Sequence, residues 1–128
     1  MRNIEFRGYS ERDSEWRHGS YSTDGVIHEI LTLIKAGTLY ASQVPLESIG
    51  QYTGLKDANG VKIFEGDILR HPVQEPRKVI YPMNETTGFF GLESVKGWKN
   101  TLQDTAFYKV IGNIYENPEK LQAITGAE

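Results

Sequence analysis

The chain has 128 residues, enough for one domain or two small lobes with a buried core, and it carries 14 Lys and Arg against 17 Asp and Glu. The net charge of −3 argues against a general nucleic-acid binder, and the absence of cysteine excludes disulfides and thiolate metal sites and fits a reducing compartment. No apolar run approaches the roughly 20 residues that a membrane-spanning helix needs, so we expect a soluble, cytoplasmic protein with no membrane partner.

Residues 1–48 are predicted to form a β-rich N-terminal segment. Alternating apolar side chains indicate a strand over residues 3–9, and residues 16–22 are expected to return as the second strand of a hairpin. Residues 26–34 allow two interpretations, because their apolar positions fit helical spacing while their β-branched content and the following Lys35-Ala36-Gly37 turn favour a strand. In the second case, residues 38–44 would pair back on them.

Residues 49–128 are predicted to contain most of the remaining strands. The expected strands are 49–53, 61–64, 68–73, 78–81, 89–93 with an extension over 95–98, and 107–115. The polar loop 54–60 between the first two contains the turn-forming pair Asn59-Gly60. About eight short strands with turns every 8–15 residues indicate a small barrel or sandwich.

A short helix is expected at the C-terminal end. Asn117 is a candidate N-cap, and Pro118 occupies the first helical position, where its missing N–H costs nothing. Leu121 and Ile124 would form its small apolar face, and Gly126 would end it.

No group of residues meets the requirements of a catalytic or metal site. Asp67 and His71 could share one strand face with Glu65 nearby, but neither their number nor their spacing matches a recognised metal site. The loop that begins at Asp57 has Ile68 where a calcium loop needs Glu. Nucleophile and phosphate-binding motifs are also absent. We therefore expect no enzyme activity, no metal and no cofactor.

Nucleic-acid binding is the alternative function, because basic and aromatic side chains accumulate in the C-terminal half, as on small β-barrels that bind single strands. The interleaved acidic residues weaken this interpretation, since they offset the positive charge. The candidate residues are Arg70, Arg77, Lys78, Lys96, Trp98 and Lys99.

Two long segments, GQYTGLKDANGVKIFEGDI over residues 50–68 and VIGNIYENPEKL over residues 110–121, resemble the YopX-like proteins of bacteriophages and prophages. The opening IEFRGYS and the later Trp16-Arg17-His18-Gly19 also resemble that family. We interpret the motif residues as structural: they are Gly50, Gln51, Tyr52, Thr53, Gly54, Leu55, Asp57, Gly60, Glu65, Gly66, Asp67, Gly112, Asn113, Tyr115, Asn117 and Pro118.

The resemblance implies a mainly β protein of a phage or prophage, working in the cytoplasm of a bacterial host. It implies an SH3-like antiparallel barrel within residues 49–128, and it favours strands over residues 26–44. It brings no established activity and no catalytic residues. Several strand edges and many aromatic side chains, both suited to interfaces, lead us to expect a non-catalytic interaction module that forms a homo-oligomer and binds an unknown protein partner.

Overall fold

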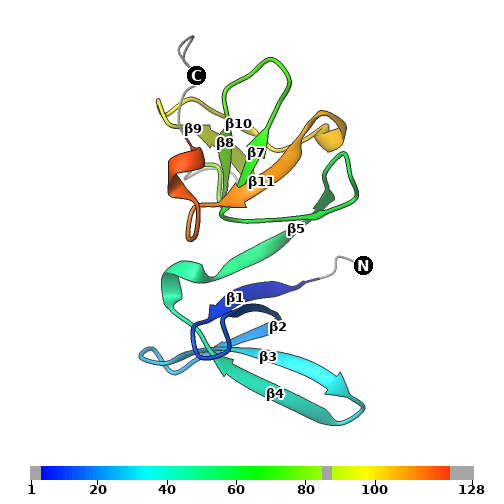
Figure 1. Ribbon diagram of the computed structural model, residues 1–128, viewed down its shortest axis with the longest axis vertical. Helices are drawn as coiled ribbons and strands as arrows, with labels where there is room; N and C mark the ends of the chain where they lie inside the picture. The colour runs from blue at the N-terminus through cyan, green and yellow to red at the C-terminus, as the bar shows by residue number, and fades with distance from the viewer. Residues whose placement is uncertain (1–3, 85–87, 122–128) are drawn as a thin grey trace. The chain divides into compact units, whose positions relative to one another are not determined.

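The computed structural model describes residues 4–84 and 88–121, and its regular elements are strands and short 3-10 turns (Figure 1). All paired strands are antiparallel, which confirms the predicted mainly β fold. The chain divides into two compact units, unit 1 (Met1–Tyr52) and unit 2 (Thr53–Glu128).

Unit 1 is built from strands that follow one another along the chain. It contains β1 (Phe6–Ser10), β2 (Glu15–Thr23), β3 (His28–Lys35), β4 (Thr38–Gln43), the 3-10 turn η1 (Leu46–Ser48) and the start of β5 (Gly50–Lys56). The strand order is β4-β3-β2-β1-β5, so β4 lies at the edge of the sheet.

The strand interpretation of residues 26–44 is confirmed, and the helical alternative is wrong. β3 and β4 form a hairpin in which Leu33 pairs with Leu39. The connecting turn places Gly37 at a φ of 76°, a left-handed conformation that glycine adopts without strain. β3 pairs with strands on both of its sides. The turn and the β-branched residues therefore determine the structure of this segment, although its apolar positions also fit helical spacing.

The buried side of the unit 1 sheet packs closely. Ile30 is fully buried and Val44 is 4% exposed. A Cβ atom added to Gly8 would lie 2.7 Å from a methyl group of Val44, so this approach of β1 requires glycine.

Unit 2 contains a five-stranded sheet in the order β10-β9-β8-β7-β11. Its elements are β6 (Lys62–Phe64), β7 (Asp67–Arg70), β8 (Arg77–Ile80), β9 (Gly91–Ser94), β10 (Lys99–Thr101), η2 (Thr105–Phe107), β11 (Lys109–Asn113) and η3 (Pro118–Lys120). The core cluster consists of Ile63, Leu69, Val79, Phe90, Leu92, Leu102 and Tyr108. Over the residues that the structure describes, these strands form open sheets and no closed barrel, so the SH3-like description stays a prediction.

Two local predictions need correction. Residues 95–98 form a turn between β9 and β10 and do not extend the earlier strand, because Ser94 Oγ accepts the N–H groups of Lys96 and Trp98, and Gly97 has a φ of 89°. Pro118 does begin a helical element, but η3 is a three-residue 3-10 turn, and Asn117 makes no side-chain cap bond to it. The rest of the expected helix, which includes Ile124 and Gly126, lies outside the described residues.

Asp57 holds the 54–60 loop against the last strand. Its Oδ1 accepts the backbone N–H groups of Asn59 (2.8 Å) and Val61 (2.9 Å), and its Oδ2 accepts that of Val110 in β11 (2.9 Å). Burial alone would raise the pKa of this carboxyl group. The three backbone donors, helped by the charge of Lys109, outweigh burial and hold the pKa of Asp57 below its ordinary value.

The other motif residues described here also fix backbone turns. Asp67, which is 1% exposed, accepts the N–H of Phe64 at 2.8 Å, and Asn113 accepts that of Glu116 at 2.8 Å. A Cβ on Gly112 would lie 2.7 Å from the Asn117 side-chain oxygen. These contacts support the structural interpretation of the motif.

We predict that Gly19→Ala destabilises the protein strongly. A Cβ at this position would overlap the Leu31 carbonyl oxygen and lie 2.8 Å from its carbon, both of them backbone atoms of the β2–β3 pairing. Separating those strands should lower the free energy of unfolding by about 3 kcal/mol or more. Gly37→Ala is the control, because it meets no atom within 4 Å and should cost only about 1 kcal/mol for its left-handed φ. Urea unfolding measures both free energies, and an equal decrease in Gly19→Ala and Gly37→Ala would contradict the prediction.

We predict that Asp57→Asn lowers the free energy of unfolding by about 2–4 kcal/mol, because an amide NH₂ replaces one acceptor oxygen of a buried, fully bonded carboxylate. Asp104→Asn is the matched control. Asp104 is exposed and has a φ of 56°, which Asn tolerates. Urea unfolding of both variants measures the difference, and similar values would refute the assigned role.

The same carboxylate should make stability depend on pH. The folded-state pKa of Asp57 lies below the unfolded value, so its contribution is present above about pH 4 and is lost as pH falls through the folded pKa. Unfolding free energies measured from neutral to acid pH should therefore fall less steeply for Asp57→Asn than for the natural chain. Parallel curves for the two proteins would contradict this.

Candidate functional site

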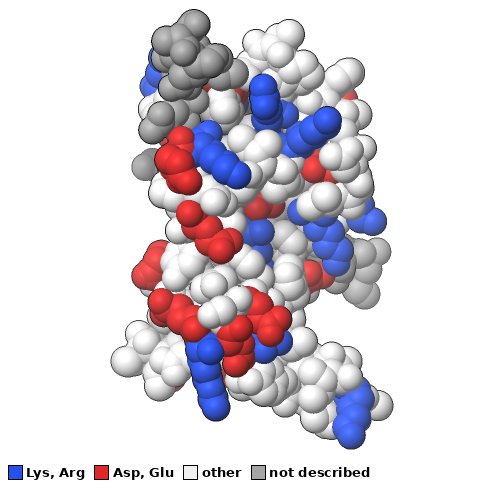
Figure 2. All heavy atoms as spheres, viewed as in Figure 1, with Lys and Arg blue, Asp and Glu red and all other residues white. Residues whose placement is uncertain are grey.

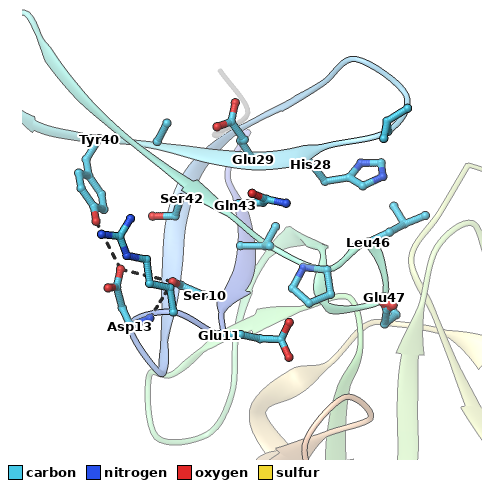
Figure 3. Close-up of a pocket in the computed structure, with 15 residues that line it drawn as sticks. Ser10, Glu11, Asp13, His28, Glu29, Tyr40, Ser42, Gln43, Leu46 and Glu47 are labelled. Atoms are coloured by element: carbon cyan, nitrogen blue, oxygen red, sulfur yellow. Dashed lines mark hydrogen bonds between the residues drawn. The ribbon is translucent and has the colours of Figure 1, made fainter.

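Unit 1 contains a groove of about 630 Å³ that follows β4. Its walls come from the β1–β2 turn, the start of β3, β4 itself and the segment that leads into η1 (Figure 3). The consecutive hairpins bring these segments together, although their lining residues are spread over 10–47 in the sequence. We call this hollow the β4 groove.

One corner of the β4 groove contains a compact polar cluster. Asp13 accepts a hydrogen bond from Arg17 at 2.8 Å, another from Ser10 Oγ at 3.3 Å and a longer one from the Tyr40 hydroxyl at 3.4 Å. The Arg17 guanidinium also lies over the Tyr40 ring, 5.2 Å from its centroid. The hydrogen bond from Arg17 is the main reason that the pKa of Asp13 lies below its ordinary value.

A buried hydroxyl group in the wall of the groove has no partner. Ser42 is 4% exposed, and its Oγ makes no hydrogen bond within the described part of the chain. Figure 3 shows this hydroxyl directed toward the space beside Tyr40 and Ser10. Leaving a buried hydroxyl unsatisfied costs about 1–3 kcal/mol, so this position is unexplained by packing alone.

The groove is acidic. Four carboxylates (those of Glu11, Asp13, Glu29 and Glu47) and one guanidinium (Arg12) line it. Asp13 is paired with Arg17, whereas the carboxylates of the three glutamates make no hydrogen bond or ion pair with any residue that the structure describes. Figure 2 shows acidic side chains gathered over the strands of unit 1.

The backbone of β4 also presents unused hydrogen-bonding groups. The N–H of Val44 donates to the His28 carbonyl at 2.9 Å, and alternation along an antiparallel ladder then turns the N–H and C=O groups of Leu39, Ala41 and Gln43 away from β3. β4 ends the sheet, so these groups have no strand partner among the residues described.

An exposed apolar surface accompanies this free edge. Leu33 and Leu39 form a cross-strand pair and are 65% and 60% exposed. Leu31 pairs with the exposed Ala41 on the same face. We call these four residues the hairpin face.

The groove and the hairpin face were missed in the sequence. Polar residues such as Ser10 and Ser42 carry no motif, and only the folded sheet brings them together. One signal was present for the edge: the six residues TLYASQ of β4 carry no charge, although edge strands are usually protected by charged residues.

The six candidate nucleic-acid-binding residues are interrupted by an acidic side chain and do not all lie on one face of the sheet. Lys78, Glu93 and Lys99 lie in one row across β8, β9 and β10, and Glu93 contacts both lysines, at 3.5 Å and 3.9 Å. Arg77 lies on the opposite face of β8, where it donates to Asn100.

The remaining three candidates, Arg70, Lys96 and Trp98, are exposed, with Trp98 at 69%. Because Arg77 and Lys78 point to opposite faces of β8, and Glu93 lies between Lys78 and Lys99, the set does not form one continuous basic surface. Nucleic-acid binding therefore stays a prediction.

Two further findings concern residues 4–84 and 88–121. They contain no group of three or more His, Asp or Glu side chains placed to hold a metal ion, and no helix long and apolar enough to cross a membrane. His71 instead accepts the N–H of Val73 at 3.2 Å and packs against the Tyr108 ring, 5.1 Å between centroids.

Comparison with known proteins identifies relatives over nearly the whole chain. The family described as "YopX protein" matches residues 5–122. The crystal structure of protein EF1440 from Enterococcus faecalis is similar, with a TM-score of 0.56 and 25% sequence identity, over 95% of this chain and 100% of that one. No curated protein matches the chain. The family match spans both units and includes the two long motifs, and the chain therefore belongs to the YopX family.

Proposed function

We propose that the chain is a non-catalytic interaction module that forms a homo-oligomer through the edge of β4. The observation that carries this proposal is the combination of an uncharged, unpartnered edge strand with the exposed hairpin face beside it. Main-chain hydrogen bonds at such an edge provide affinity for another strand, and buried apolar side chains add to it.

A second copy of the chain is the partner that this edge fits best. Two β4 strands related by a two-fold axis would pair antiparallel and use the free groups of Leu39, Ala41 and Gln43 in both copies. The two hairpin faces would then form one continuous apolar surface. Since β4 carries no charge, no like charges meet at the new strand pair.

The charges at the two ends of the hairpin support the same arrangement. Lys35 lies beside the β3–β4 turn, paired with Thr38, whereas Glu29 lies at the other end, paired with Gln43. Antiparallel pairing brings the basic end of one copy toward the acidic end of the other, which is the favourable combination.

We also propose that the protein belongs to a phage or prophage and works in the cytoplasm of its bacterial host, where the oligomer would bind a further protein. The support is the resemblance of its motifs to YopX-like proteins of phages and prophages. A catalytic role has no support from the residues gathered in the groove, which include no activated nucleophile.

The proposal predicts that the natural chain has a concentration-dependent mass above the 14.5 kDa of one copy. Leu39→Lys places a charge on the hairpin face and should weaken self-association about tenfold or more, because the ammonium group must be desolvated on pairing. Ala41→Pro removes an N–H that faces away from β3, so it should weaken association while leaving the β3–β4 hairpin paired. Light scattering and sedimentation measure both effects.

Val73→Lys is the control, because Val73 is an 86% exposed apolar residue in unit 2. It should leave the mass unchanged. A natural chain that stays monomeric at high micromolar concentration would overturn the proposal, as would equal association by the natural chain and both β4 variants.

A further inference from the structure

We propose that the β4 groove binds a ligand carrying an ammonium or guanidinium group. This site goes beyond self-association and does not depend on it. Three features support it: uncompensated negative charge, an unpartnered buried hydroxyl and an internal guanidinium already bound in the same corner.

The charge of the lining selects a cation. Glu11, Glu29 and Glu47 make no ion pair with any described residue, and Arg12 is the one cationic side chain in the lining. Figure 3 shows Glu11 and Glu47 on the same side of β4, near the segment that leads into η1. Carboxylates in a concave surface concentrate counter-ions there, so the hollow should attract a cationic group.

The Ser42 hydroxyl is a second and independent indication. It is buried in the wall and lacks a hydrogen-bond partner, whereas the other buried serine of the groove, Ser10, is bonded to Asp13. A ligand N–H could donate to Ser42 Oγ and so satisfy it. The oxygen is covered by neighbouring side chains, so the ligand must displace them. Tyr40, on the same face of β4, is 39% exposed, and the hydrogen bond from its hydroxyl to Asp13 is long, at 3.4 Å.

The corner beside Ser42 shows that the groove suits this chemistry. There the Arg17 guanidinium lies between the Asp13 carboxylate, 2.8 Å away, and the Tyr40 ring. An acidic group and an aromatic face are the two elements that recognise guanidinium and ammonium groups in proteins. The unpaired glutamates repeat the acidic element along the rest of the groove.

The size of the groove allows two sources of such a group. At about 630 Å³ it lies within the range of small-ligand sites. A free polyamine and an Arg or Lys side chain of a peptide share the chemistry required. The experiment distinguishes the two sources by titrating spermidine in one arm and the peptide acetyl-Ala-Arg-Ala-amide in the other. The same peptide with citrulline in place of Arg is the uncharged control for the second arm.

Calorimetric titration at low ionic strength should detect binding of at least one cationic probe and none of the citrulline peptide. The double variant Glu11→Gln with Glu47→Gln should weaken that binding about fivefold or more, because two charges that face the ligand are lost. Ser42→Ala should also weaken it about fivefold, while the urea midpoint of the protein stays equal or rises, since an unsatisfied hydroxyl is removed.

The control removes the same charge elsewhere. Glu75→Gln with Glu119→Gln neutralises two carboxylates of unit 2 and should leave binding unchanged. The proposal would be overturned if binding fell equally in both double variants or stayed unchanged in Ser42→Ala. It would also be overturned if the citrulline peptide bound equally well, or if neither cationic probe bound. Repeating the titration at a low and a high protein concentration keeps the result independent of self-association, which is judged by mass alone.

Discussion

The fold of unit 2 depends on one carboxylate. Asp57 accepts three backbone N–H groups, two from its own loop and one from Val110, which is 53 residues further along the chain. A neutral side chain of similar shape could satisfy some of these donors but not all, because only a carboxylate offers enough acceptor capacity without donating. In the family motif, Asp57, Asp67 and Asn113 accept backbone N–H groups, which agrees with the structural interpretation of these residues.

The predictable part of this fold was the part set by local chemistry. Strand alternation and turn residues such as Asn59-Gly60 and Gly37 were sufficient to predict the mainly β fold and, with the family resemblance, to favour the β3–β4 hairpin. The extension over residues 95–98 failed because Ser94 satisfies turn N–H groups with its side chain, which composition alone does not reveal. The C-terminal helix signal was locally sound at Pro118, yet the described part forms only a 3-10 turn.

The candidate site was not predictable in the same way. The β4 groove joins the β1–β2 turn to β4 and the residues after it, and each contributes ordinary polar side chains whose meeting depends on the curl of the sheet. For the basic residues of unit 2, the sequence predicted a shared surface that the structure does not show. They cluster in sequence, but strand alternation directs Arg77 and Lys78 to opposite faces, and Glu93 lies between Lys78 and Lys99. Proximity along a strand is thus a poor guide to a shared surface.

The hydrogen bond between Asp57 and Val110 joins two distant parts of the sequence, and this affects the order in which the chain folds. Unit 1 pairs β1 with β2, β2 with β3 and β3 with β4, so each pairing closes a short loop as soon as the next strand has been synthesised. In unit 2, the pairing of β7 with β11 and the hydrogen bond from Val110 to Asp57 must wait for β11, almost at the end of the chain. We therefore expect a nascent chain to carry a formed N-terminal sheet, with its free β4 edge, before the C-terminal sheet is complete. That edge would be available to other strands throughout synthesis, and polysomes would bring neighbouring copies of it close together.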